Sequence, residues 1–199
     1  MRAPQDVHEL RKRLAADIFT ASKALLGAFL VKGEMRSRIV EVEGYREGDD
    51  PGSHAFRGPT PRIQVMYGAP GRAYVYFTYG MYWMLNVVAH EEGSAAAILV
   101  RAAQPLSGQD EMRLRRPKAR RDEDLLSGPG KLCLAYGIDR RFNGMDLLDP
   151  TSELHIEVGP MPKRIVTGTR IGLAPGKGDE LPWRFMDADH MRWVSKPHV

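Results

Sequence analysis

The chain has 199 residues, of which 43% are hydrophobic and 27% charged, with a net charge of +4. This length fits one compact domain that can bury a core without covalent staples. Cys133 is the single cysteine, which excludes an intrachain disulfide framework and a multi-cysteine zinc site. No apolar run reaches the ~20 residues of a membrane helix, and the charged N-terminal segment lacks a signal-peptide pattern. We therefore expect a soluble protein of a reducing compartment, the cytoplasm or a nucleus.

The first 20 residues are expected to form a helix or a loose arm, set apart from a single domain over residues 21–199. Apolar residues recur there at every fourth position, at Leu10, Leu14 and Ile18. A second short helix is predicted over residues 20–27, with Thr20 as its N-cap and Gly27 at its end.

Stretches rich in β-branched and aromatic residues predict an antiparallel sheet. Its main strands are expected at residues 29–32, 37–43, 73–79, 82–89 and 96–103, with shorter pieces at 154–158, 165–173 and 182–186. Gly80 and Met81 predict a two-residue type II′ hairpin turn. A long loop is expected over 44–61, a polar excursion over 105–127, and a short helix over 131–137. The absence of βαβ alternation favours a mixed α+β domain with a curved antiparallel sheet.

Two carboxylates, Glu41 and Glu43, lie at a predicted strand end just before Gly44. Regular alternation would place Ile39, both glutamates and Tyr45 on one face of the sheet. A buried carboxylate in this position can act as a general base on water. Spacing alone nevertheless favours two ordinary solvent-facing glutamates.

The predicted hairpin is unusually aromatic. Five of the ten Tyr and Trp residues fall within ten positions, at Tyr74, Tyr76, Tyr79, Tyr82 and Trp83. Each buried hydroxyl or indole N–H needs a partner, so a plain core rarely uses so many. A protruding Tyr79 beside the turn would make a wedge between stacked bases, and inward tyrosines would stack on a planar ligand. An aromatic sheet face packed on a helix remains the alternative.

Other chemical motifs are weaker. The six histidines form no HExxH pattern, so no metal site is predicted, and His54 is the one histidine near the candidate carboxylates. Residues 127–131 read SGPGK, which resembles a turn that holds phosphate, although this signal alone favours an ordinary structural turn. The basic run over 113–121 indicates either a solvated, mobile loop or a contact with nucleic acid.

Taken together, four stretches resemble the alkyladenine DNA glycosylase family, also called the 3-methyladenine or alkylpurine type. They are residues 38–62, 70–88, 98–106 and 127–147, and they occur in the order and approximate spacing of that family. The most specific blocks are EVEGY at 41–45 and YVYFTYGM at 74–81. The likeness runs from about Ala21 to Arg184.

The resemblance implies a single mixed domain whose curved antiparallel sheet carries a hairpin that enters the DNA minor groove. It implies a DNA glycosylase that acts on double-stranded DNA containing a damaged purine. No lysine lies in the blocks around Glu43 and Tyr76, which predicts a monofunctional enzyme. No cofactor or metal is predicted, and action on one duplex at a time favours a monomer. The alternatives are a non-catalytic nucleic-acid-binding module and a hydrolase of free nucleosides.

The resemblance also assigns roles to residues of this chain. Glu43 matches the general base, and Arg101 matches an arginine that supports it. The residues that match the pocket around the extruded base are Tyr45, His54, Tyr76 and Asn86. Tyr79 matches the intercalating residue, and we expect Gly130 and Lys131 to contact the DNA backbone.

Overall fold

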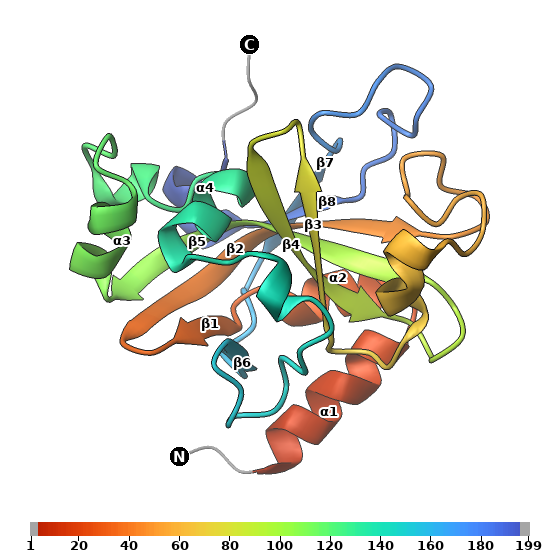
Figure 1. The fold of residues 1–199 in the computed structure, drawn as a ribbon, viewed down its shortest axis with the longest axis horizontal. Helices are drawn as coiled ribbons and strands as arrows, with labels where there is room; N and C mark the ends of the chain where they lie inside the picture. Colours follow the sequence, from red (N-terminus) through yellow and green to blue (C-terminus); the bar gives the residue numbers. More distant parts are fainter. Residues whose placement is uncertain (1–3, 196–199) are drawn as a thin grey trace.

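The fold is that of a computed structural model, which describes residues 4–195 (Figure 1). The helices are α1 (Pro4–Ala15), α2 (Ile18–Leu25), α3 (Gln109–Arg115) and α4 (Pro129–Tyr136). The strands are β1 (Phe29–Lys32), β2 (Met35–Arg46), β3 (Ala73–Thr78), β4 (Tyr82–Ala89), β5 (Ala96–Ser107), β6 (His155–Glu157), β7 (Ile165–Gly168) and β8 (Arg184–Asp187). All of these strands join one curled antiparallel sheet. The predicted α+β class is therefore confirmed.

Strand β2 is the centre of this sheet. It pairs with β5 along one edge, and along the other edge first with β1 and then with β8. The register with β5 shifts on each side of Glu41, where the second edge changes partner. Because such a bulge breaks the alternation of side chains, Ile39 packs in the main core and does not share a face with Glu41. The predicted regular alternation is wrong at this point.

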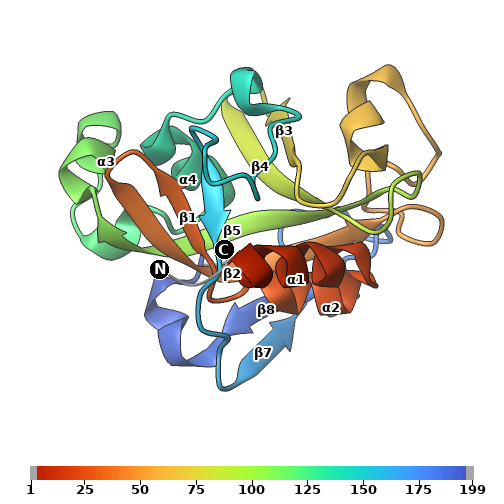
Figure 2. The ribbon, with the colours of Figure 1, turned by 90° about the horizontal axis from the view of Figure 1, so that it is seen from below.

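The N-terminal helices α1 and α2 lie side by side against the sheet (Figure 2). Leu10, Leu14 and Ile18 are buried in the main core, so the predicted apolar stripe is a packing face. The second helix begins at Ile18, and its N-cap is Asp17, whose carboxylate accepts the N–H groups of the two residues after Ile18. The predicted N-cap at Thr20 is therefore wrong. The domain boundary at residue 20 stays a prediction.

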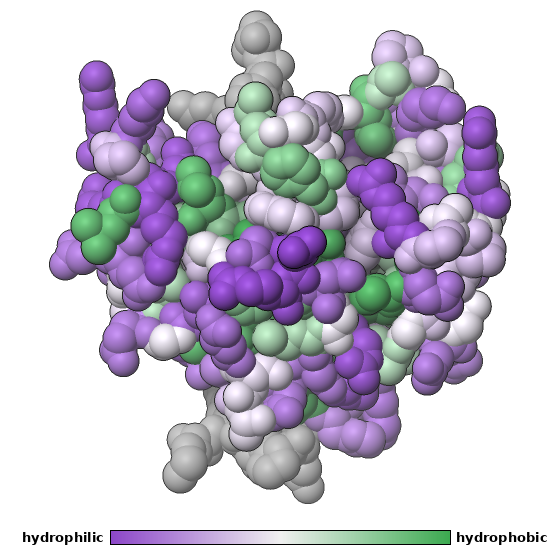
Figure 3. All heavy atoms as spheres, in the orientation of Figure 1, coloured by the Kyte–Doolittle hydropathy of each residue, from purple (hydrophilic) through white to green (hydrophobic). Residues whose placement is uncertain are grey.

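The hairpin β3–β4 protrudes from the sheet (Figure 1). Thr78 pairs with Tyr82, which leaves a connection of residues 79–81. Tyr79 and Gly80 both have positive φ, at 52° and 68°, so the turn is of the primed type centred on these two residues. The predicted type II′ turn at Gly80 and Met81 is wrong. Figure 3 shows hydrophobic side chains over the hairpin between hydrophilic surfaces, and Tyr79 is 74% exposed.

Several strands differ in length from the prediction. β2 continues through Gly44, where a side chain would meet Ile18 of α2 at 2.7 Å, so this glycine marks a close approach and not the start of a loop. β5 continues to Ser107 through Pro105, which lies beyond the residues that pair with β4. β7 ends at Gly168, five residues earlier than predicted.

The basic run is partly helical and makes several contacts within the protein. Its first residues belong to α3, and α4 then begins at Pro129, two residues before the predicted start. Four of its arginines have internal partners, namely Asp122 for Arg113, Glu111 for Arg115, the carbonyls of Asp124 and Leu125 for Arg116, and Asp124 for Arg121. Most of its charge is therefore committed within the protein.

Candidate active site

A cavity of about 780 Å³ opens between the hairpin, the strands β2 and β5, and the start of α4. Its lining includes every predicted site residue except Glu43, namely Tyr45, His54, Tyr76, Tyr79, Asn86, Arg101, Gly130 and Lys131. These residues come from β2 and the loop after it, the β3–β4 hairpin, β5 and the start of α4. The topology therefore gathers the predicted residues at one place.

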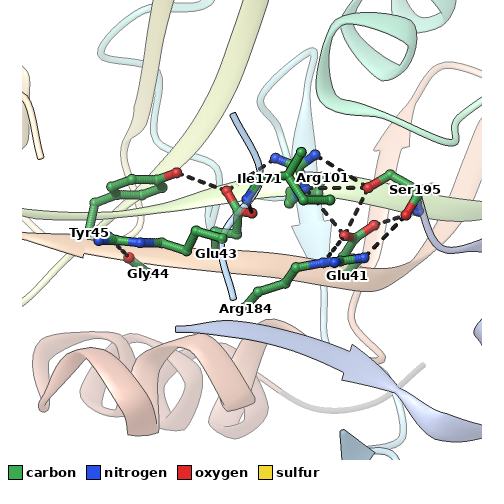
Figure 4. Close-up of polar contacts among 9 residues, drawn as sticks. Glu41, Glu43, Gly44, Tyr45, Arg101, Ile171, Arg184 and Ser195 are labelled. Atoms are coloured by element: carbon green, nitrogen blue, oxygen red, sulfur yellow. Dashed lines mark hydrogen bonds and ion pairs between the residues drawn. The ribbon is translucent and has the colours of Figure 1, made fainter. Parts of the chain in front are cut away.

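Glu43 lies directly behind the cavity wall and is fully buried. Its carboxylate accepts hydrogen bonds from three residues that line the cavity (Figure 4). The donors are the Tyr45 hydroxyl at 2.8 Å, Nη1 of Arg101 at 3.1 Å and the Ile171 N–H at 2.7 Å. Burial raises the pKa of the Glu43 carboxyl, and the Arg101 charge and the other two donors offset this only in part. The carboxylate is therefore a stronger base than an exposed glutamate.

Three aromatic side chains form one side of the cavity. The His54 ring lies 4.6 Å from the Tyr76 ring, and its Nδ1 is 2.9 Å from the hydroxyl of Tyr74. Burial and the nearby Arg62 charge lower the pKa of His54, so the imidazole is neutral at pH 7. Burial raises the pKa of Tyr74 to about 12, so its hydroxyl keeps its proton. This wall offers ring faces and hydrogen-bonding groups without a formal charge.

Asn86 lines the cavity from β4, which lies between β3 and β5. Its side chain is buried, and its Nδ2 donates to the carbonyl of Tyr74 at 3.1 Å. This bond fixes the orientation of the amide toward whatever enters the cavity. This fixed amide fits a pocket that discriminates between ligands by shape and hydrogen bonding.

The two residues at the start of α4 differ in what holds them. A side chain at Gly130 would lie 2.8 Å from the ring of Tyr82, so close packing against the hairpin explains this glycine. Lys131 places its Nζ 3.2 Å from the hydroxyl of Ser127. Both line the cavity mouth, and their contact with a DNA backbone stays a prediction.

Comparison with known proteins identifies the family. The sequence model of methylpurine-DNA glycosylase matches residues 12–191, which is most of the chain. The chain belongs to the methylpurine-DNA glycosylase family. It is therefore a DNA glycosylase, a hydrolase that acts on N-glycosidic bonds, and the resemblance inferred from its motifs is confirmed.

Relatives in this glycosylase family come from distant organisms. The chain is 46% identical over 171 residues to a protein of Methanocella arvoryzae, a match that covers 83% of this chain and 85% of the relative. It is 45% identical over 172 residues to a protein of Nitrosospira multiformis, with 86% of each chain covered. It is 39% identical over 196 residues to a protein of Streptomyces avermitilis, with 92% of this chain and 89% of the relative covered. Each relative bears the name "Putative 3-methyladenine DNA glycosylase".

Sequence reasoning missed several residues around the glycosylase site. Ile171 reaches Glu43 through its backbone N–H, which carries no sequence signal. Arg170 is fully buried, pairs with Asp50 through two hydrogen bonds, and lies 4.6 Å from the ring of Tyr45. The sequence carries no pattern that indicates which arginine pairs with Asp50.

Among residues 4–195, no three His, Cys, Asp or Glu side chains lie together in a way that could hold a metal ion. Within the same residues, every helix is too short or too polar to span a bilayer.

Proposed function

We propose that this protein is a monofunctional glycosylase that rotates a damaged purine out of duplex DNA and hydrolyses its N-glycosidic bond with water activated by Glu43. The observation that carries the proposal is the hydrogen bond between Tyr45 and Glu43. It places a buried carboxylate directly behind a wall on which a base can stack. The sugar of a base held at that wall would then face the carboxylate.

Binding of the extruded base falls to the aromatic wall. Tyr45, Tyr76 and His54 line the cavity, and each base–aromatic stack contributes ~1–3 kcal/mol. Extruding a base costs a few kcal/mol, and least for damaged or mispaired bases. The free energy that two such stacks contribute is therefore comparable to the free energy needed to extrude the base. The neutral wall accepts a neutral purine and also attracts a cationic alkylpurine through its ring faces.

Tyr79 is proposed to fill the gap that the extruded nucleotide leaves. Its ring is 74% exposed at the tip of a protruding hairpin and also lines the cavity mouth. Apolar wedges on stiff ribbons are a known means of unstacking base steps from the minor groove. The same side chain can therefore enter the stack beside the pocket that receives the base.

In the proposed reaction, the water oxygen bonds to C1′ of the sugar while the C1′–N bond breaks. The bonding electron pair leaves with the purine, and the water proton passes to the Glu43 carboxylate. The negative carboxylate also stabilises the oxocarbenium-like sugar. Oε2 of Glu43 accepts from Tyr45 and Arg101, and Oε1 accepts from Ile171. Because a carboxylate has about four acceptor positions, this water can still donate a hydrogen bond to Oε1.

The proposed product is an abasic site in an unbroken strand. A bifunctional enzyme would need an amine that forms a Schiff base with the sugar. Among residues 4–195, Lys131 is the one lysine that lines the cavity, and it lies at the mouth beside Ser127 rather than at Glu43. This arrangement favours water as the nucleophile.

Two alternatives predict different binding behaviour. A non-catalytic nucleic-acid-binding module would have no need of a buried carboxylate behind its pocket. A hydrolase of free nucleosides would have no need of the exposed Tyr79. The salt dependence of binding distinguishes the hydrolase of free nucleosides from the DNA glycosylase. Duplex affinity falls steeply as the salt concentration rises, whereas KM for a free nucleoside does not change in this way.

The decisive experiment is base release from duplexes that each carry one lesion: 3-methyladenine, 7-methylguanine, hypoxanthine or ethenoadenine. Glu43→Gln should retain duplex binding and lose single-turnover excision by about two orders of magnitude or more. Glu34→Gln, on the exposed turn between β1 and β2, is the control and should keep wild-type excision. Undiminished excision by Glu43→Gln would reject Glu43 as the base.

A further inference from the structure

A second buried carboxylate, Glu41, belongs to a network behind the cavity (Figure 4). Its oxygens accept hydrogen bonds from Nε of Arg101 at 3.2 Å and from Nε of Arg184 at 2.6 Å. They also accept the N–H of Ser195 at 2.6 Å and its hydroxyl at 2.8 Å. Glu41 therefore joins strands β2, β5 and β8 to the segment at Ser195.

Arg101 is held from several directions by this network. Its Nη1 binds Glu43, its Nε binds Glu41, and its Nε and Nη2 both lie within 3.4 Å of the Ser195 hydroxyl. A guanidinium is a rigid planar fork, so contacts on several of its nitrogens fix its plane as well as its position. The donor that reaches Glu43 cannot turn away unless the other contacts break.

The charges in this region balance. Glu41 and Glu43 carry two negative charges, and Arg101 and Arg184 carry two positive charges. Glu41 pairs with Arg184 at 2.6 Å and with Arg101 at 3.2 Å, so Arg184 balances much of the Glu41 charge while Arg101 is shared between Glu41 and Glu43. The charged and titratable groups around Glu43 are Glu41 and Tyr45 on β2, Tyr76 on β3, Arg101 on β5, Arg184 on β8, and Arg170 in the segment after β7.

We propose that Glu41, Arg184 and Ser195 are positioning residues that clamp Arg101 against Glu43. This inference rests on the proposed role of Glu43 as the general base. Arg101 and Ser195 line the cavity, whereas Glu41 acts only through Arg101. The clamp holds Arg101, and through it the Glu43 carboxylate, in one orientation behind the cavity wall.

Two charge-neutralising variants test the clamp through the pH profile of single-turnover excision. The acid limb is the low-pH part of this profile, where the rate rises as Glu43 loses its proton. Glu41→Gln removes a negative charge beside Arg101, so the Arg101 charge acts more fully on Glu43 and the acid limb should move to lower pH. Arg184→Gln leaves both carboxylates to share Arg101, so the acid limb should move to higher pH. Each variant should also lose about tenfold or more of the plateau rate, because small misplacements of a catalytic group are costly. Duplex affinity should change by less than about threefold.

Asp187→Asn is the matched control for the loss of a buried charge. Asp187 pairs with Arg38 in a buried contact that includes neither Arg101 nor Glu43. This variant should lower the melting temperature and leave the acid limb in place. If Glu41 has only a structural role, Glu41→Gln should likewise lower the melting temperature and leave the acid limb in place.

Ser195 supplies a milder test in case the charge variants fail to fold. Ser195→Ala removes one hydroxyl and should lower the plateau rate severalfold, and Ser195→Thr should restore it because the hydroxyl returns. Wild-type rates and acid limbs in every variant that folds, Ser195→Ala included, would overturn the clamp. If Glu43→Gln also excises normally, the proposed function fails; if Glu43→Gln is inactive, only the clamp fails.

Discussion

The hydroxyl of Tyr45 donates a 2.8 Å hydrogen bond to Oε2 of Glu43, which lies two positions earlier on the same strand. Gly44 between them lets α2 approach the strand closely on the other side. One short segment thus carries the proposed stacking ring, Tyr45, in direct contact with the proposed general base, Glu43. Removing the Tyr45 hydroxyl should therefore separate substrate binding from the chemical step.

Tyr45→Phe should keep base binding and weaken the chemistry. The ring remains available for stacking, but Glu43 loses a donor that stabilises its charged form, so its pKa should rise further. We expect wild-type duplex affinity, an acid limb at higher pH, and a rate loss confined to that limb. Tyr45→Ala should instead lose affinity for the extruded base by about 1–3 kcal/mol. Equal effects of both variants on affinity would contradict this division.

The pH profile of the wild-type enzyme should show its acid limb above the ordinary glutamate pKa of 4.5. Burial raises the pKa of Glu43, and only the ionised form can accept a proton, so the excision rate should rise with pH through the raised value and then level off. His54 should add no limb near its usual value, because burial and Arg62 lower its pKa. Single-turnover rates between pH 4.5 and pH 9 measure this. The limb should be lost in Glu43→Gln.

Tyr79→Gly should separate the wedge from the stability of its turn. Tyr79 has a φ of 52°, which costs a residue with a side chain about 1–2 kcal/mol relative to glycine. The variant should therefore melt at the same or a higher temperature while losing excision from a fully paired duplex. Tyr79→Ala, which keeps the strain, should lose excision equally but gain no stability. Unchanged excision in both variants would reject the wedge.

Borohydride trapping tests the monofunctional mechanism. Reduction during turnover should give no covalent complex with DNA, because no amine attacks the sugar. Lys131→Ala should weaken binding to all duplexes alike. It should also reduce the slope of log affinity against log salt concentration by about the amount that one phosphate contact contributes. A trapped complex that disappears in Lys131→Ala would contradict a water nucleophile.

Leu14→Ala tests whether α1 is part of the fold or a separable arm. Leu14 is fully buried in the main core, so truncating it should lower the free energy of unfolding by roughly 2–5 kcal/mol. Leu114→Ala, at a position that is 82% exposed, should change it by less than about 0.5 kcal/mol. Denaturant unfolding measures both. A small effect of Leu14→Ala would favour the arm predicted from the sequence.

The sequence predicted the secondary-structure elements that depend mainly on residues close together in the chain. The hairpin strands, the first strand pair and α4 follow from β-branched and aromatic runs and from turn residues. The N-cap was misplaced because Asp17 and Thr20 are both good caps, and only the structure shows that Asp17 accepts the free N–H groups. The turn was misplaced because glycine commonly takes the first position of such turns, whereas here Tyr79 takes positive φ.

The site was predictable only where side chains form a motif. Glu43, Tyr45 and Tyr76 lie in short blocks that resemble a known family. Arg184 and Ser195 lie 143 and 154 residues from Glu41, and no short-range pattern links them. Their contact depends on β8 joining the edge of β2, which is decided by the packing of the whole sheet.

The three-partner position of β2 has a dynamic consequence. Each of its amide groups faces β5 on one edge or β1 and β8 on the other, and it opens only when that neighbour separates. We therefore expect the segment that carries both glutamates to exchange its hydrogens slowly. The tip of the β3–β4 hairpin has no such neighbours and should exchange early. Hydrogen exchange should therefore report two separate levels of protection, a high one at the glutamates and a low one at the exposed end of the hairpin.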